Sequence, residues 1–355
     1  MNLDDLGYER VRDRHQDGQD PEGFTIGRVA AEHRERYLVR TGSGEFEAEI
    51  TGNIRFTAKN REDFPAVGDW VAMATYDPDQ AIIHRILPRY SVIRRQAAGK
   101  TGEVQIIATN IDYGLIIQAA DRDFNLNRME RYLTICNASG VRPVIVISKA
   151  DLVEEDQLQR MTSSIGQRIP DIPVICISNT TRRGYEALGP YLKKGITCCM
   201  LGSSGIGKST LLNNLSGQPI METGTISAHT NKGRHVTSHR ELVVLEEGGI
   251  LIDNPGMREV GIADTGQGLD VTFDRIIQHA GDCRYADCTH TGEAGCSVIA
   301  AVESGEIGMA EYENYLRMER ETAFYNTTLE ERRRKDKEFG KLMKNYKKDK
   351  RKNGY

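Results

Sequence analysis

The sequence predicts a multi-domain protein with an N-terminal β-barrel (an OB-fold), a central α/β domain and a C-terminal, mostly helical metal-binding domain. Three patterns support this division. Short strand-like segments fill residues 23–96, apolar segments alternate with helical ones over residues 97–265, and cysteines cluster within residues 270–330. A chain of 355 residues is long enough for two or three such domains.

The barrel is predicted from strands at residues 37–40, 45–50, 69–73 and 81–86, which turn residues separate. About five short strands in a segment of this size favour an OB-fold, and another small β-domain is the alternative. An OB-fold can present a face to oligonucleotides, but the fold alone does not establish that ligand.

The central domain is predicted from continuous apolar segments between helical stretches. These segments are residues 105–109, 113–118, 143–148, 173–178, 196–201 and 250–253. Continuous apolar strands are typical of a mostly parallel sheet that helices cover on both faces. We therefore expect a doubly wound α/β domain.

A complete phosphate-loop motif follows the apolar segment 196–201 and precedes a predicted helix. Its backbone N–H groups would cradle the phosphates of a nucleoside triphosphate, the lysine would reach the β- and γ-phosphates, and the serine after it would bind Mg²⁺. The predicted residues are Gly202, Ser203, Ser204, Gly205, Ile206, Gly207, Lys208, Ser209 and Thr210.

Three further strand ends carry residues that suit a nucleotide. Asp253, with Gly256 three residues later, suits the magnesium shell and the γ-phosphate. A carboxylate at Asp151 could accept both guanine donors, which adenine lacks, so GTP is favoured over ATP. The segment Ser148, Lys149, Ala150 and Asp151 and the pair Ser178 and Asn179 are therefore the predicted base site.

The base-reading segments precede the phosphate loop, the reverse of their order in a Ras-like GTPase. A circular permutation of the sheet would keep the same site, because site geometry does not depend on chain order. The segment after Asp253 would then lead directly into the C-terminal domain.

Four potential metal ligands lie within 14 residues near the C-terminus: Cys283, Cys288, His290 and Cys296. Three thiolates and one imidazole suit a closed tetrahedral site, so one structural zinc ion is predicted, and unligated thiols are the alternative. Residues 331–355 form a basic tail, with 12 Lys and Arg against 3 Asp and Glu from residue 332 to residue 352. The tail suits an anionic partner, and a solvated terminus is the alternative.

These motifs together resemble the small ribosomal subunit-dependent GTPase A family, whose members are circularly permuted. The resemblance covers residues 25–300 and includes the segments 64–70, 86–89, 123–132 and 233–238. It implies an OB-fold, a permuted GTPase and a zinc domain, with GTP or GDP and the small ribosomal subunit and its rRNA as partners. The resemblance implies a role in late maturation of that subunit.

The chain departs from the family pattern at two sites. Ser148 stands where the family has Asn, which puts guanine selectivity in doubt. The segment 236–238 differs from the family's three threonines, so the second magnesium ligand is placed at Thr237, with Ser238 as the rival.

The sequence lacks the glutamine that usually positions the attacking water just after the Asp253 turn, and has Met257 and Arg258 there instead. His235 is the candidate catalytic residue that would orient water, and a surface histidine is the alternative. Slow turnover that the subunit stimulates is therefore expected. A nucleotide-gated RNA-binding module without hydrolysis and a P-loop ATPase remain alternatives.

The N-terminal segment and the length of the apolar runs bear on the location of the protein. Residues 1–22 are polar, lack a secretory signal and are expected to be flexible. No apolar run approaches the roughly 18 residues of a membrane span. We expect a cytoplasmic monomer with no membrane partner.

Overall fold

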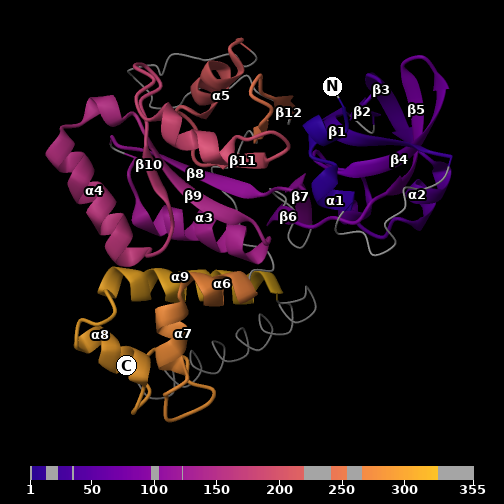
Figure 1. Ribbon diagram of the computed structural model, residues 1–355. Helices are drawn as coiled ribbons and strands as arrows, with labels where there is room; N and C mark the ends of the chain where they lie inside the picture. Colours follow the sequence, from indigo (N-terminus) through magenta and orange to yellow (C-terminus); the bar gives the residue numbers. More distant parts are fainter. Residues whose placement is uncertain are drawn as a thin grey trace, which may run out of the picture.

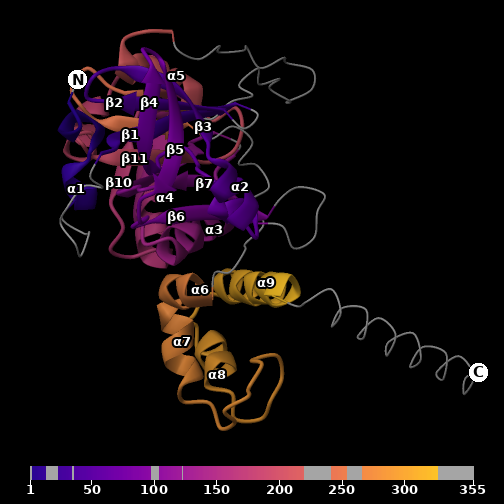
Figure 2. The same cartoon turned by 90° about the vertical axis from the view of Figure 1, so that its right-hand side faces the viewer.

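The computed structural model describes residues 2–12, 23–33, 36–96, 104–121, 123–219, 241–253 and 266–326. Within these ranges the chain forms three parts: a barrel, a sheet with helices on both faces, and a group of helices (Figure 1). The turned view in Figure 2 confirms that the helical group lies below the sheet, next to α3 (Leu126–Ala138). In the part of the chain described, no helix is both long and apolar enough to cross a membrane.

The barrel is built from five strands. They are β1 (Thr25–His33), β2 (Arg36–Thr41), β3 (Glu45–Ile50), β4 (Trp70–Asp77) and β5 (Gln80–Ile86). The strand order is β1-β2-β3-β5-β4, and pairing between β1 and β4 closes the barrel. The short helices α2 (Gly52–Thr57) and η2 (Arg61–Asp63) connect β3 to β4. The predicted OB-fold is confirmed.

The N-terminal segment differs from the expectation of a flexible end. Residues 2–12 form η1 (Asp4–Leu6) and α1 (Glu9–Arg12), and the side chains of Leu6, Tyr8 and Val11 are buried. The Tyr8 ring lies 4.7 Å from the Trp70 ring of β4, between centroids. Together with Leu3, which packs on the same core, these side chains hold the segment against the barrel.

The central sheet has the strand order β10-β9-β8-β11-β13-β12, and only β12 runs antiparallel to its neighbour. The strands are β8 (Tyr113–Ala119), β9 (Arg142–Ser148), β10 (Val174–Cys176), β11 (Thr197–Leu201), β12 (Glu241–Val244) and β13 (Ile250–Asp253). A single residue pair between β1 and β12, Ala31 with Glu241, joins this sheet to the barrel. The prediction of a mostly parallel sheet is confirmed, and β12 is an addition to it.

One predicted strand does not belong to that sheet. Residues 104–109 form β7 (Val104–Thr109), which pairs antiparallel with β6 (Val92–Gln96) in a separate two-stranded sheet. Only three residues separate β7 from β8. A parallel crossover needs a dozen or more residues, so β7 and β8 cannot be parallel neighbours.

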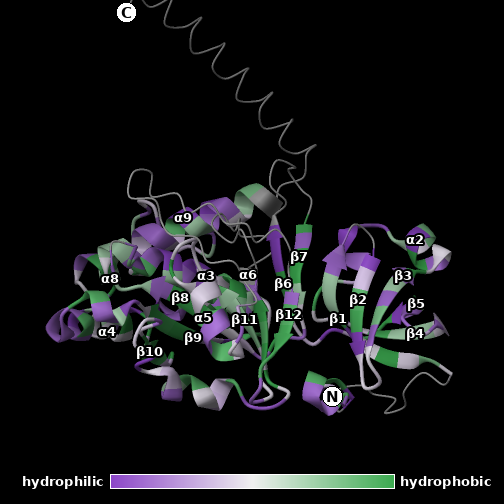
Figure 3. Ribbon diagram, turned by 90° about the horizontal axis from the view of Figure 1, so that it is seen from above, coloured by the Kyte–Doolittle hydropathy of each residue, from purple (hydrophilic) through white to green (hydrophobic). Residues whose placement is uncertain are grey.

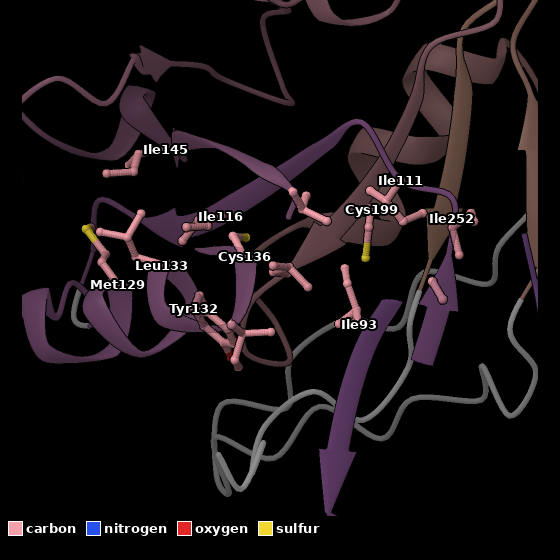
Figure 4. Close-up of a cluster of buried hydrophobic side chains, with 14 of the residues drawn as sticks. Ile93, Ile111, Ile116, Met129, Tyr132, Leu133, Cys136, Ile145, Cys199 and Ile252 are labelled. Atoms are coloured by element: carbon pink, nitrogen blue, oxygen red, sulfur yellow. The ribbon is translucent and has the colours of Figure 1, made fainter. Parts of the chain in front are cut away.

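Helices cover both faces of the central sheet. Helices α3 and α4 (Glu155–Arg168) pack on one face, and α5 (Lys208–Ser216) and η4 (Tyr185–Tyr191) pack on the other. Figure 4 shows the first face, where side chains of α3 such as Met129 and Cys136 point toward the strands and Ile93 of β6 extends the same core. Figure 3 shows that hydrophobic residues concentrate on the strands.

The C-terminal group consists of α6 (Gly266–Thr272), α7 (Asp274–Ala280), α8 (Ser297–Glu303) and α9 (Met309–Asn326). It has a core of its own, to which Phe273, Ile276 and Met318 contribute. Helix α6 crosses α3 so closely that a Cβ at Gly268 would lie 2.5 Å from the Thr134 carbonyl oxygen. The group therefore packs directly on the helix that covers the sheet.

Candidate nucleotide and metal sites

The phosphate loop connects β11 to α5 at the carboxyl end of the parallel strands. Gly202, Gly205 and Gly207 all have positive φ angles, of 151°, 82° and 98°. A Cβ at Gly202 would lie 2.5 Å from the Ile117 carbonyl oxygen, and one at Gly207 would lie 2.6 Å from Asn179 Nδ2. Glycine is therefore required by both conformation and space, and the loop turns its backbone toward the α5 N-terminus, where a phosphate would bind.

Lys208 begins α5 and folds back over the loop. Its Nζ donates to the carbonyl oxygens of Gly202, at 2.8 Å, and Ser203, at 2.5 Å. Burial lowers the pKa of Lys208 to about 8, and the nearby carboxylates of Asp253 and Asp123 act in the opposite direction. An ammonium has three donors, so one remains beyond these two bonds for an anionic ligand.

Ser148, at the end of β9, contacts the phosphate loop itself. Its hydroxyl lies 2.6 Å from the Ile206 carbonyl oxygen and 3.3 Å from that of Gln118. One hydroxyl proton can satisfy only one of them at a time, and the shorter contact favours Ile206. The serine therefore ties the base-reading segment to the phosphate loop.

The next three residues of this segment differ in exposure. Lys149 has a positive φ of 56°, and its Nζ lies 2.8 Å from Asp121 Oδ2. Ala150 is buried, and its N–H donates to the Ile177 carbonyl oxygen at 3.0 Å. Asp151 is exposed, so its carboxylate is accessible to a ligand.

The second base-reading segment lies against the same loop. Asn179 Nδ2 donates to the Gly207 carbonyl oxygen at 2.9 Å, and Asn179 Oδ1 accepts from the Tyr185 hydroxyl at 2.8 Å. Ser178 is buried, and its hydroxyl accepts from the Thr181 N–H at 3.1 Å. The structure thus brings both segments and the phosphate loop together, although they are far apart in the sequence.

Asp253 ends β13, next to β11, and is buried. Its Cα pairs with Met200, just before the phosphate loop, so the carboxylate belongs to the same edge of the sheet as Ser209. Ser204, Gly205, Ser209 and Thr210 lie along the loop and the first turn of α5. Gly256, His235 and Thr237 lie outside the described residues.

The four predicted metal ligands come together. The ligand atoms of Cys283, Cys288, His290 and Cys296 all lie within 4.8 Å of one another, and Cys283 Sγ lies 3.8 Å from Cys296 Sγ. His290 Nδ1 lies 3.6 Å from Cys283 Sγ and 3.5 Å from Cys296 Sγ. A tetrahedral site with Zn–S bonds of about 2.3 Å would place sulfur ligands about 3.8 Å apart. The cluster can therefore hold one metal ion.

The loop around the cluster is held by its own hydrogen bonds. The Glu293 carboxylate accepts from the N–H groups of Thr289, at 2.9 Å, and Thr291, at 3.0 Å. The hydrogen bonds from the Thr289 hydroxyl and then from the Thr289 N–H keep the pKa of Glu293 well below its usual range. His290 has a positive φ of 58°, and its carbonyl oxygen accepts from the Tyr312 hydroxyl of α9 at 2.6 Å. The cluster is thereby attached to the longest helix of the group.

Two charged residues of the candidate nucleotide site, Asp121 and Arg128, were not among the residues predicted from the sequence. Asp121 follows β8 and pairs with Lys149, and Arg128 of α3 contacts Ser203 of the phosphate loop. The position of Asp121 just after an apolar strand could have suggested from the sequence that it belongs to the site. Arg128 lies within the segment 123–132 that carried the family resemblance, but no local pattern links it to residue 203.

Comparison with known proteins identifies the family. A model described as "RsgA GTPase" matches residues 86–263. A model described as "ABC transporter" also matches residues 186–352, which include the phosphate loop. "Small ribosomal subunit biogenesis GTPase RsgA 2" of Lactiplantibacillus plantarum is 43% identical over 302 residues, covering 85% of this chain and 84% of the relative. The protein of that name from Vibrio parahaemolyticus is 37% identical over 350 residues, covering 99% and 94%.

Two solved structures resemble this fold. The crystal structure of YjeQ from Thermotoga maritima has a TM-score of 0.61 and 25% identity, covering 83% of this chain and 97% of that one. The structure described as YloQ, a circularly permuted GTPase, has the same TM-score at 22% identity, covering 86% and 98%. The arrangement of barrel and permuted GTPase sheet is therefore that of known proteins.

Proposed function

This chain belongs to the RsgA GTPase family and is a ribosome-biogenesis GTP hydrolase, and on that premise we propose that it binds the small ribosomal subunit and its rRNA and assists late maturation of the subunit. Intrinsic hydrolysis is slow, and the subunit stimulates it. The observation that supports a GTP-driven cycle best is the convergence of Ser148 and Asn179 on the phosphate loop, with the exposed Asp151 carboxylate beside them.

In the proposed complex the phosphate loop holds the phosphates, and Asp151 accepts hydrogen bonds from guanine. Ser209 and Thr237 ligate the Mg²⁺ that accompanies GTP, with Asp253 in its shell and Gly256 near the γ-phosphate. His235 orients the attacking water in place of the missing glutamine. GDP occupies the same site after hydrolysis.

The Cys283, Cys288, His290 and Cys296 cluster holds a structural zinc ion in this proposal, because all four tetrahedral positions are filled by protein. Zinc would fix the loop between α7 and α8. The barrel, the zinc domain and the basic tail at residues 331–355 contact rRNA, a polyanion whose binding to Lys and Arg weakens steeply with salt. The protein acts as a cytoplasmic monomer.

The decisive experiment is a GTP hydrolysis assay with the protein alone, with purified small subunits and with purified large subunits. Stimulation by small subunits alone is expected. GTP binding without turnover in any mixture would favour a nucleotide-gated RNA-binding module. Competition between ATP and GTP tests the base assignment, since ATP binding as tight as GTP binding would favour a P-loop ATPase.

The zinc assignment has its own test. Chelation of the purified protein should release about one zinc ion per chain and increase amide exchange in residues 266–326, while the central sheet stays protected. Release of iron instead of zinc would overturn the assignment.

A further inference from the structure

The segment between β8 and α3 lies against both halves of the nucleotide site. Asp121 pairs with Lys149 of the base-reading segment at 2.8 Å. The buried Gln118 accepts a hydrogen bond from the Asn125 N–H at 3.2 Å, which fixes the end of the segment next to α3. The start of α3 is therefore held at a defined place beside the phosphate loop.

Two side chains of α3 reach the phosphate loop at Ser203. Arg128 Nη1 donates to Ser203 Oγ at 2.8 Å and lies 2.7 Å from Asp123 Oδ2. Tyr132, one helical turn further on the same face, is also hydrogen-bonded to Ser203. Burial raises the pKa of Tyr132 to about 12, so the phenol keeps its proton at neutral pH.

Ser203 is in turn a support for Lys208. The Ser203 carbonyl oxygen accepts from Lys208 Nζ at 2.5 Å, and Ser203 itself is buried. A displacement of Ser203 would thus move one of the two acceptors that aim the ammonium. The contacts form a continuous path from the Arg128 guanidinium through Ser203 to the lysine that the phosphates require.

We propose that Arg128 is a positioning residue for phosphate binding, which holds Ser203 and so aims Lys208. Both contacts are made by Nη1, whose two N–H groups have directions fixed by the guanidinium plane, whereas a lysine ammonium would make them with less fixed geometry. Asp123 holds the guanidinium in place. The proposal rests on the GTP hydrolase activity of the chain and goes beyond it by assigning a residue outside the nucleotide-binding motifs.

Helix α3 does not depend on Arg128 for its own position. Its buried side chains Met129, Leu133 and Cys136 pack on the sheet, and the Asn125 side chain caps its N-terminus. Truncation of Arg128 should therefore leave the helix in place and release only the contact with Ser203.

The test compares Arg128→Ala, Arg128→Lys, Ser203→Ala and the double variant R128A/S203A, in the full-length chain. Arg131→Ala is the matched control, because Arg131 lies on the same helix but pairs with Glu321 of α9. Equilibrium dissociation constants for GTP and GDP, KM, kcat and the unfolding temperature are measured for each. The Kd arms need no turnover and no ribosome, so they test this proposal separately from the proposed function.

We expect Arg128→Ala to raise the Kd for GTP and KM about ten-fold, as for loss of a charged hydrogen bond, with a smaller change in kcat. Arg128→Lys should recover part of the lost affinity, and Arg131→Ala should leave the Kd unchanged. The Kd of the double variant should be no higher than that of the single variant with the higher Kd. An unchanged Kd in Arg128→Ala, equal losses in Arg128→Ala and Arg131→Ala, or additive losses in the double variant would overturn the proposal. Should Arg128→Ala fail to fold, Arg128→Met, which keeps the alkyl stem and removes the donors, tests the same contact, and an unchanged Kd for GTP in that variant would overturn the proposal.

Discussion

Arg28, which is buried, and Lys208, which is half-buried, are two cations at opposite ends of strand β11. Arg28 of the barrel hydrogen-bonds Thr197, the first residue of the strand, and Lys208 lies beyond its last residue in the phosphate loop. Burial lowers the pKa of both side chains. The two residues differ in what satisfies their donors.

Most of the hydrogen-bond donors of the Arg28 side chain are used within the protein. Its side chain donates to the carbonyl oxygens of Leu6, Gly68 and Asn110 and to the hydroxyl of Thr197, at 2.7 to 3.2 Å. Four of the five guanidinium donors are thus used on the N-terminal segment, the barrel and the central sheet. This cation holds three parts of the molecule together at the end of the sheet opposite to the nucleotide site.

Among the described residues, Lys208 donates only to the loop that contains it. Its two bonds go to carbonyl oxygens of Gly202 and Ser203, and its charge remains available to phosphate. One strand thus carries a structural cation at its amino end and, at its carboxyl end, a cation that we propose binds phosphate. Removal of each should therefore affect a different property.

Removal of the structural cation should have the largest effect. Arg28→Leu removes four buried hydrogen bonds, and although the carbonyl oxygens of Gly68 and Asn110 keep a second donor, we expect the free energy of unfolding to fall by about 4 kcal/mol. Urea denaturation measures it. Arg36→Leu is the control, because Arg36 is 65% exposed and its pairs with Glu47 and Glu49 should contribute under about 1 kcal/mol. Equal losses in the two variants would contradict the structural role.

Removal of the Lys208 charge should weaken GTP binding without destabilising the fold. Lys208→Met keeps a side chain of similar length, and loss of the charge should weaken GTP binding by about 3 kcal/mol, or about 100-fold in Kd. The unfolding free energy should stay equal or rise, since a cation with a lowered pKa is a cost to the folded state. Lys194→Met, at a side chain 60% exposed that pairs with Asp5, should leave Kd unchanged. A large loss of stability in Lys208→Met would remove the distinction from Arg28.

The pH dependence of GTP binding above pH 8 should include a contribution from Lys208. With a pKa of about 8, the lysine of the nucleotide-free protein loses its proton above pH 8, so Kd should rise up to about ten-fold per pH unit above that value. Unfolding should become less favourable over the same range up to the ordinary lysine pKa, because the unfolded chain binds a proton that the folded chain lacks. Titration of Kd from pH 7 to pH 9 tests this, and a dependence that persists in Lys208→Met would assign it to another group.

The smallest expected effect concerns the hydrogen bond between the end of β9 and the phosphate loop that contains Lys208. Ser148→Ala removes the hydroxyl that contacts the Ile206 carbonyl oxygen at 2.6 Å. Loss of one neutral hydrogen bond should weaken GTP binding by about 1 kcal/mol, or about five-fold. The Kd measures it, with Ser164→Ala on α4 as the control, since that hydroxyl bonds only within its own helix. An unchanged Kd would mean that the phosphate loop does not need this contact.

Local patterns predicted most of the fold and of the site. The apolar segments at 113–118 and 143–148 became β8 and β9, and the spacing of Cys283 to Cys296 became a four-ligand cluster, because each pattern is set by residues close in sequence. The segment 105–109 was placed in the wrong sheet, because an apolar strand of that length does not reveal its pairing partner. The domain boundaries and the roles of His235 and Thr237 stay predictions.

The sequence by itself determined the phosphate-loop motif, the order of the nucleotide motifs and the candidate metal ligands, since these depend on short-range spacing and on residue chemistry. Only the tertiary structure decided which distant residues support them. Arg28 meets Thr197 across 169 positions of the chain, and Arg128 meets Ser203 across 75. Such pairs leave no periodic signal, because their contacts exist only once the barrel, the sheet and α3 have packed together.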